Sequence, residues 1–578
     1  MVTLFSFFIT SLACVAVNAS PYSINGAISN LQWGPCPSTM KNWTSVYPYQ
    51  CSTLAVPLDY SNPKDDRTLN LQLLRMKALI QPAKGAILFN PGGPGAVGTR
   101  LVVSSGEEYQ TILEGQYDLI GFDPRGTGNT IPYACNITSE AATKVRRQVS
   151  PETTLPEDPQ DLSVDPEALS LAQTLELVQV GLDELSETYA SACARDNAEY
   201  GDLVGTAFVA RDMLHIVDAL NQGNLLNYWG VSYGTVLGGT FAAMFPDRVG
   251  LMLLESNVNL HEYMSGVNLE ARVTLDDNIY GLFADCIVAG LESCILAEAD
   301  QTAASLAQNY RNLLDALDEQ PVQVAGQNIS GQVVRDFVLG QLYNPTDWPE
   351  IAAALDTLYQ GEWEKFYNMT ISPPPSQYNK GTQALSGIRC GDQYTRVNNA
   401  TLIEGLVEKL DNISTWFPLQ PLVESLSCLV WQQNAKERYN GNFEATTKTP
   451  ILVLNNAFDN ITPLISARNT SAGFSNSALL VQNSYGHVPE YTPSLCTAQA
   501  IRDYFLSGAL PTPGTVCEQE VANFQTQNWT EVYQDLTPSN SALASKKQYT
   551  KDEITMLSAV QSLGLKMSNL HKSLGRSW

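Results

Sequence analysis

Residues 227–246 read NYWGVSYGTVLGGTFAAMFP, and Ser232 stands between two glycines in this stretch. The apolar residues before the serine predict a strand, and those after it predict a helix. A serine flanked by Gly230 and Gly234 on a sharp strand-to-helix turn is the pattern of a nucleophile elbow, because only glycines fit so tight a turn. The alternative is a Gly-rich turn without chemistry, so the pattern needs support from the rest of the chain.

Short apolar stretches alternate with amphipathic ones on both sides of this turn. We expect strands at residues 68–79, 85–90, 117–123, 227–231, 249–254, 451–455 and 478–482, and helices at residues 202–220 and 233–245. This alternation is typical of a mostly parallel sheet flanked by helices. Residues 256–449 read as mostly helical, which predicts a cap inserted into the sheet domain.

Composition and the first residues narrow the class of protein. The chain has 578 residues and a formal net charge of −26, which argues against nucleic acid as a partner because phosphates would be repelled. Residues 1–19 hold a short apolar run that ends in small residues, so they predict a secretory signal peptide, with a membrane anchor as the alternative. No other stretch is apolar and long enough to predict a membrane span in the mature chain. We therefore expect a secreted, extracellular protein.

Cysteines and glycosylation motifs agree with secretion. Eleven cysteines occur, and ten remain after Cys14 leaves with the signal peptide, an even number typical of an oxidising compartment. Connectivity does not follow from sequence, but the sequential neighbours are Cys36 and Cys51, Cys135 and Cys193, Cys286 and Cys294, Cys390 and Cys428, and Cys496 and Cys517. Acceptor motifs for N-glycosylation begin at Asn42, Asn136, Asn328, Asn368, Asn399, Asn412, Asn469 and Asn528. A further motif at Asn460 is disfavoured by the proline that follows it.

A serine nucleophile needs a base, and the base needs an acid that orients it, in the chain order Ser, Asp or Glu, His for this architecture. The four histidines are His215, His261, His487 and His571. The first two come too early and the last lies in the tail, whereas His487 follows an expected strand. Asp459 follows another expected strand upstream. The expected catalytic residues are therefore Ser232, Asp459 and His487.

An oxyanion hole requires two backbone N–H groups near the nucleophile. Tyr233, the residue after the serine, is expected to supply one. The loop NPGGPG at residues 90–95 is expected to supply the other, from Gly92 or Gly93. A phosphate-binding loop is the competing interpretation of these glycines, but the Lys-Ser/Thr pair of such loops is missing.

The motifs NPGGPG, DPRGTGNT, GVSYGT, AFDNITP and YGHVPEY, in this order, resemble the secreted tripeptidyl-aminopeptidase-like branch of the α/β-hydrolase superfamily, which is related to prolyl iminopeptidases. The resemblance spans about residues 32–517. It implies an α/β-hydrolase fold with a helical cap, no cofactor or metal, and release of short peptides from free N-termini. The chain departs from the common pattern at Asn90, where iminopeptidases usually have His, at Thr130, which replaces a Ser, and at Glu255-Ser256, which replaces Asp-Gly.

The resulting division of the chain has five parts. They are a signal peptide (1–19), the first part of the α/β-hydrolase core (20–255), a helical cap (256–449) before the catalytic acid, the C-terminal TAP-like part of the core (450–525), and a tail (526–578) that contains one amphipathic helix. Asp123 and Arg125 are interpreted as a buried brace of their loop. Glu255 and Asp392 are candidates for binding the substrate ammonium group, with a structural or solvated carboxylate as the alternative for each.

Three functions remain open from the sequence. The first is a secreted serine exopeptidase that releases tripeptides or similar short peptides from peptide substrates. The second is an esterase or lactonase that uses the same three residues, since neither the elbow nor the oxyanion loop distinguishes between acyl groups. The third is a binding protein without catalysis, which the intact Ser232, Asp459 and His487 argue against.

Overall fold

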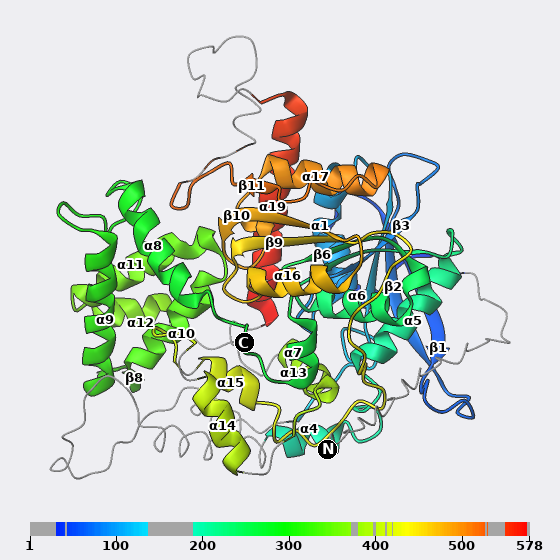
Figure 1. Ribbon diagram of the computed structural model, residues 1–578, viewed down its shortest axis with the longest axis horizontal. Coiled ribbons are helices and arrows are strands. Elements are labelled where there is room, and N and C mark those ends of the chain that lie inside the picture. The colour runs from blue at the N-terminus through cyan, green and yellow to red at the C-terminus, as the bar shows by residue number, and fades with distance from the viewer. Residues whose placement is uncertain are drawn as a thin grey trace, which may run out of the picture.

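A computed structural model describes residues 31–40, 43–136, 189–370, 380–396, 400–410, 413–418, 420–525, 527, 529 and 549–574. Its centre is a nine-stranded sheet with the order β1-β2-β4-β3-β5-β6-β9-β10-β11 (Figure 1). The strands are β1 (Tyr49–Pro57), β2 (Thr68–Met76), β3 (Ala86–Asn90), β4 (Asp118–Asp123), β5 (Leu226–Val231), β6 (Val249–Glu255), β9 (Leu452–Phe458), β10 (Ala478–Tyr485) and β11 (Val516–Glu518).

Only the first two pairings along this order are antiparallel, and every later neighbour is parallel. The mostly parallel sheet expected from the sequence is therefore confirmed. Strands β3 and β4 are buried along their whole length, which explains their unbroken apolar character. Strand β1 instead alternates buried and exposed residues at the sheet edge, and sequence analysis did not identify it.

Helices cover both faces of the sheet. One apolar core joins the sheet to α5 (Thr206–Leu220), α6 (Tyr233–Met244) and α16 (Leu464–Gly473). A second joins it to α1 (Gly98–Ile112), α17 (Leu495–Ser507) and α19 (Lys551–Leu574). The amphipathic helix expected in the tail is thus α19, and it belongs to the core of the molecule. Sequence analysis did not identify α1 and α17.

The chain between β6 and β9 is largely helical. It contains α7 (Leu260–Ser265), α8 (Leu275–Ala289), α9 (Ala303–Glu319), α10 (Gly331–Leu342), α11 (Trp348–Tyr359), α12 (Trp363–Thr370), α13 (Lys380–Asp392), α14 (Ala400–Leu410) and α15 (Gln420–Leu426). A short hairpin of β7 (Val322–Val324) and β8 (Gln327–Ile329), which the sequence did not predict, lies among them. Helices α8 to α12 gather at the end of the sheet away from β1 and α5 (Figure 1). They surround an apolar core of their own that includes Tyr310, Trp348 and Trp416.

Five disulfides form, and each joins cysteines that are neighbours in sequence order: Cys36–Cys51, Cys135–Cys193, Cys286–Cys294, Cys390–Cys428 and Cys496–Cys517. Of the glycosylation candidates, Asn136, Asn368 and Asn469 are exposed and Asn328 is half-buried, whereas Asn42, Asn399, Asn412 and Asn528 lie outside the described residues. The expected signal peptide at 1–19 also lies outside them. Within the described ranges, none of the helices has the length and apolar character that a membrane span needs.

Candidate active site

Ser232 occupies the turn between β5 and α6. Its backbone has φ 58° and ψ −123°, a conformation that non-glycine residues seldom adopt and that is concentrated at functional sites. A Cβ on Gly230 would lie 2.5 Å from the carbonyl oxygen of Gly234, and a Cβ on Gly234 would lie 2.7 Å from the carbonyl oxygen of Asn90, so neither position has room for a side chain. The amide of Ser232 donates to the carbonyl of Glu255 at 2.9 Å, which ties the turn to β6.

The Gly-rich loop after β3 lies directly against this turn. Gly92 and Gly93 have φ angles of 92° and 104°, and a Cβ on Gly92 would lie 2.5 Å from the Val231 carbonyl and 3.1 Å from the Tyr233 amide. The Asn90 side chain accepts a hydrogen bond from the Gly92 amide at 2.9 Å. Asn90, which replaces the usual His, therefore bonds the backbone of its own loop, and the Gly92 amide already has a hydrogen-bond acceptor. Of the two candidate glycines, Gly93 is therefore the better oxyanion donor, because its amide is not the one that bonds Asn90.

Asp459 and His487 meet beyond the ends of β9 and β10. Nδ1 of His487 lies 3.1 Å from Oδ2 of Asp459, and both side chains are fully buried. The carboxylate also accepts the amides of Ile461 and Thr462, each at 2.8 Å, and the Thr462 hydroxyl at 2.7 Å. Nε2 of His487 is buried without a hydrogen-bond partner among the described residues.

Thr462 was not identified by sequence analysis. Its hydroxyl lies 3.1 Å from Nδ1 of His487 as well as bonding Asp459, so it touches both members of the pair. Its position three residues after Asp459 is the local signal that could have revealed it, since Asp and Thr side chains commonly bond the backbone within such turns.

The sheet explains why the segments that carry Ser232, Asp459 and His487 lie at one edge. β5, β6, β9 and β10 are parallel neighbours, so their carboxyl ends share one edge. Ser232 follows β5, Asp459 follows β9 and His487 follows β10. Between them, Ser256 follows β6 and its hydroxyl donates to the His487 carbonyl at 2.5 Å. Ser256 has φ 57°, a conformation that favours glycine, and the similar family commonly has glycine at this position. Here the Ser256 hydroxyl instead bonds the loop at residues 486–491, which carries His487 (the histidine loop).

Glu255, one of the two ammonium candidates, is completely buried. It accepts a hydrogen bond from the Trp229 indole at 2.8 Å, and the Glu490 carboxyl is a close neighbour. Burial raises the pKa of Glu255 well above its usual range, and the neighbouring Glu490 carboxyl raises it further. Burial also raises the pKa of Glu490. The two carboxyls therefore form a pair that retains a proton.

Asp392, the other candidate, ends α13. Its carboxylate accepts the amide of Thr206 at 2.8 Å, the Thr206 hydroxyl at 2.5 Å and the Tyr263 hydroxyl at 3.0 Å. Burial raises the pKa of Asp392 to about 6, against the lowering effect of these bonds. The Thr206 hydroxyl lies 2.6 Å from the hydroxyl of Tyr233. Asp392 is thus linked through Thr206 to the residue that follows Ser232.

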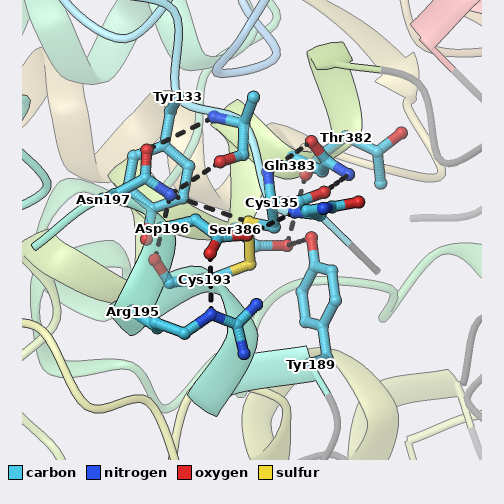
Figure 2. Close-up of a disulfide and its surroundings, with 12 residues drawn as sticks. Tyr133, Cys135, Tyr189, Cys193, Arg195, Asp196, Asn197, Thr382, Gln383 and Ser386 are labelled. Atoms are coloured by element: carbon cyan, nitrogen blue, oxygen red, sulfur yellow. Dashed lines mark hydrogen bonds and ion pairs between the residues drawn. A yellow bond between two sulfur atoms is a disulfide. The ribbon is translucent and has the colours of Figure 1, made fainter. Parts of the chain in front are cut away.

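Helix α13 covers the oxyanion loop and is pinned to the core. A Cβ on Gly95 would lie 2.4 Å from the Gly381 carbonyl, so helix and loop are in direct backbone contact. Beside the Cys135–Cys193 disulfide, the Gln383 side chain donates to the Cys135 carbonyl at 3.0 Å and accepts its amide at 2.9 Å (Figure 2). The helical insertion between β6 and β9 therefore contacts the candidate site through α13, which hydrogen bonds hold beside the disulfide.

Asp123 and Arg125 have bonding partners that suit a brace. Asp123 accepts the Thr99 hydroxyl at 2.7 Å and the Asn129 amide at 3.1 Å. Arg125 is fully buried and pairs with Asp212 at 2.6 Å.

His571 is the largest departure from the sequence analysis, which left it in the tail. Its ring lies 6.0 Å from that of His487, and its Nδ1 bonds the Tyr491 hydroxyl at 2.7 Å. Burial and the nearby His487 lower the pKa of His571 to about 3. No short-range pattern points to this neighbour, because it depends on where α19 packs.

The strand order, the elbow at Ser232 and the Asp459–His487 pair at the shared strand edge define an α/β-hydrolase. Two family models match the chain, one described as "alpha/beta hydrolase fold" over residues 85–290 and one described as "TAP-like protein" over residues 420–517. The chain therefore has an α/β-hydrolase fold, is similar to TAP-like proteins over residues 420–517, and is a serine hydrolase.

Curated relatives span most of the chain. A tripeptidyl aminopeptidase of Streptomyces coelicolor is 23% identical over 513 residues, which are 87% of this chain and 88% of the relative. Serine protease Hip1 of Mycobacterium tuberculosis is 24% identical and covers 84% of this chain and 91% of the relative. A carboxylesterase B of Mycobacterium tuberculosis is also 24% identical, over 84% of this chain and 89% of the relative. The relatives thus include both peptidases and an esterase.

Solved structures resemble the chain less closely. An esterase from Thermogutta terrifontis matches with a TM-score of 0.31 and 12% identity, over 78% of this chain and 98% of that chain. A TM-score of this size adds nothing to the argument. The fold assignment rests on the strand order and the family models.

Proposed function

We propose that this protein is a secreted serine exopeptidase that releases tripeptides or similar short peptides from free N-termini. The Asp459–His487 contact at 3.1 Å, at the sheet edge shared with the Ser232 elbow, is the observation that carries the proposal. The relatives named tripeptidyl aminopeptidase and serine protease favour peptides as substrates. Five disulfides favour an oxidising, extracellular compartment.

In the proposed mechanism, the Ser232 hydroxyl attacks the scissile carbonyl carbon while His487 Nε2 takes its proton. The buried Nε2 without a partner is the atom suited to this role. Asp459 holds Nδ1–H, which fixes the tautomer, and its other bonds keep the carboxylate from turning. His487 then gives the proton to the leaving amine, and water hydrolyses the acyl-enzyme by the same steps in reverse.

The oxyanion of the tetrahedral intermediate would be held by the amides of Tyr233 and Gly93. Tyr233 begins α6, so the positive end of that helix also faces the developing charge. Gly92 is the supporting residue: its amide is bonded to Asn90, and its lack of a side chain lets the loop approach Ser232.

Exopeptidase specificity would come from the helices inserted between β6 and β9. Helix α13 covers the oxyanion loop, so the insertion limits access to chain ends. For the substrate ammonium we favour Asp392 over Glu255. Asp392 is linked to Tyr233 through Thr206, whereas burial and the nearby Glu490 raise the pKa of Glu255 and so favour its uncharged form.

An esterase is the second candidate, because one relative carries the name carboxylesterase B and because acyl transfer to Ser232 is common to both reactions. The decisive measurement is paired kinetics on one peptide with a free and with an acetylated N-terminus. We expect cleavage of the free form and poor cleavage of the acetylated one. Equal rates would contradict the exopeptidase proposal and favour an esterase or an endopeptidase.

Three variants test the assigned residues. Ser232→Ala should give a folded protein that a fluorophosphonate probe no longer labels, and labelling at full strength would overturn the nucleophile assignment. Asp392→Asn should lower kcat/KM about 10- to 1,000-fold for the free peptide, or about 1.4–4 kcal/mol, and shrink its advantage over the acetylated one. Glu255→Gln in the same assay decides between the two carboxyls.

A further inference from the structure

The C-terminal helix α19 (red in Figure 1) lies outside the region matched by the TAP-like model, yet it packs on two elements of the candidate site. Along α1, which follows the oxyanion loop, Lys566 pairs with Glu108, and Ser562 bonds the same carboxylate at 2.6 Å. A Cβ on Gly564 would lie 2.2 Å from the carbonyl oxygen of Glu490, three residues after His487. Helix and histidine loop are thus in backbone contact.

The end of α19 also contacts the helical insertion. Lys572 pairs with Asp347 at 2.8 Å, and the Asn344 side chain donates to Ser568 at 3.2 Å. A small cavity of about 30 Å³ lies between these residues, with Tyr343, Tyr491 and His571 among its lining. The helix therefore bridges the core, the histidine loop and the insertion at one point.

His571 is the side chain that α19 presents there. Burial raises the pKa of Tyr491 well above its usual range, so its hydroxyl keeps its hydrogen, and it lies 2.7 Å from Nδ1 of His571. The Pro91 carbonyl can only accept, so we assign the tautomer in which the Tyr491 hydroxyl donates to Nδ1. Nε2 of the neutral ring then carries the hydrogen. Within the described residues, Nε2 of His571 has no well-formed hydrogen bond. The Pro91 carbonyl, on the oxyanion loop, is nevertheless close enough to raise the pKa of the His571 ring.

The Tyr343 ring completes the contact. It lies 4.7 Å from the His487 ring and 5.3 Å from the His571 ring, edge to face in both cases. His571 therefore reaches the histidine loop through Tyr491 and Tyr343, and it faces the oxyanion loop at Pro91. It makes no hydrogen bond to Asp459 or His487.

We propose that His571 is a positioning residue, through which α19 fixes the loop that carries His487 relative to the oxyanion loop. This inference rests on the proposed function, because it assumes that His487 is the base. Displacement of a base by about 1 Å is enough to lower the rate about 100-fold, while the substrate still binds elsewhere in the cleft. Loss of His571 should therefore act on kcat.

The test compares His571→Ala with His571→Gln in the full chain. In His571→Ala we expect kcat to fall about 10- to 100-fold and KM to stay within about threefold. His571→Gln should recover much of kcat, because its amide oxygen can accept from Tyr491 and its NH₂ group can donate to Pro91. His261→Ala is the matched control, since His261 is exposed on α7.

A second variant tests the docking without touching His571. Gly564→Val puts a side chain against the Glu490 carbonyl and should lower kcat like His571→Ala, whereas Leu565→Val, at the neighbouring position with 55% exposure, should not. A rise of KM at constant kcat would overturn the proposal and make His571 a substrate-binding residue. Unchanged kinetics in both His571 variants, or in Gly564→Val, would also overturn it.

The fluorophosphonate probe keeps the two proposals apart. Ser232→Ala should abolish labelling whatever His571 does, and His571→Ala should slow labelling without abolishing it. Undiminished labelling of Ser232→Ala would contradict the proposed nucleophile. A labelling rate of His571→Ala equal to that of the wild type would contradict the positioning role alone.

Discussion

Asp459 and His571 lie close to the same histidine, but the molecule holds them in different ways. Asp459 is fixed by its own turn, in which Ile461 and Thr462 supply three hydrogen bonds to the carboxylate. His571 is held by a helix from the far end of the chain, which is anchored by backbone contact at Gly564 and by the ion pair of Lys572. The acid thus depends on bonds within four residues, whereas the second histidine depends on how a whole helix docks.

This difference predicts different responses to change. A local turn around a charged acceptor resists movement, because each lost bond to a carboxylate costs about 1.5–3 kcal/mol. A docked helix is stabilised by many apolar contacts, so the loss of one ion pair at its end should change the free energy of unfolding only slightly. Substitutions on the two sides of His487 test this contrast.

The largest effect is expected for Asp459→Asn. The amide can donate to Nδ1 and so stabilise the wrong tautomer of His487, which should lower kcat about 10⁴-fold. Steady-state kinetics on a peptide substrate measure this, with Asp66→Asn as an exposed control. If kcat of Asp459→Asn fell no more than kcat of His571→Ala, the predicted difference between Asp459 and His571 would be wrong.

A smaller loss is expected for Thr462→Val. The substitution removes one hydrogen bond to Asp459 and the contact with Nδ1, but the two backbone amides remain. We expect kcat to fall about 10-fold, or about 1.4 kcal/mol, at nearly constant KM. Restoration of most of the activity by Thr462→Ser would attribute the loss to the hydroxyl, and an equal loss in both variants would speak against this interpretation.

The Glu255–Glu490 pair should make stability depend on pH. Because both pKa values are raised by burial, the folded protein keeps a proton that unfolded glutamates lose above about pH 4.3. The stabilisation is complete below that pH and declines as pH rises toward the folded pKa values. Each retained proton contributes a slope of about −1.4 kcal/mol per pH unit in the free energy of unfolding.

Glu490→Gln should therefore flatten this decline, by up to the slope of one proton. Urea unfolding between about pH 5 and 8 measures the slope, and Glu292→Gln is the exposed control. An unchanged slope in Glu490→Gln would mean that Glu490 retains no proton of its own in the folded protein. This variant also leaves the backbone carbonyl on which Gly564 packs, so it separates the charge of Glu490 from helix docking.

The smallest effect is expected for Lys572→Ala. Its ion pair with Asp347 is about one-third exposed on the lysine side, so its loss should cost less than about 1 kcal/mol of unfolding free energy. Thermal unfolding at low and high salt measures this. A larger loss would show that α19 depends on its last turn more than on its apolar face.

The contrast also explains what the sequence could predict. Ser232, Asp459 and His487 each follow an apolar strand, so strand recognition and chain order were enough to select them. The parallel neighbours β5, β6, β9 and β10 then place the segments after these strands at one edge, where Asp459 and His487 are in contact. The amphipathic pattern of α19 was equally visible, and the helix forms where it was expected.

The sequence did not reveal what α19 packs against. The neighbours of His571 come from η5 (Pro489–Tyr491) and from the loop after α10, and no periodicity encodes such contacts. Glu255 is a residue whose surroundings the sequence could not predict. Its place at a strand end suggested a cleft carboxylate, but its burial against Trp229 and Glu490 depends on side chains far away in sequence.

The Cys135–Cys193 disulfide has a consequence for proteolysis. It joins residues 58 positions apart. Beside it, Gln383 donates to the Cys135 carbonyl and Asn197 donates to the Cys193 carbonyl, so both ends are held (Figure 2). A protease that cuts between the two cysteines leaves both pieces in one covalent molecule. Such a nicked protein would migrate as a single species on a non-reducing gel and as two fragments after reduction, with α13 still seated over the oxyanion loop.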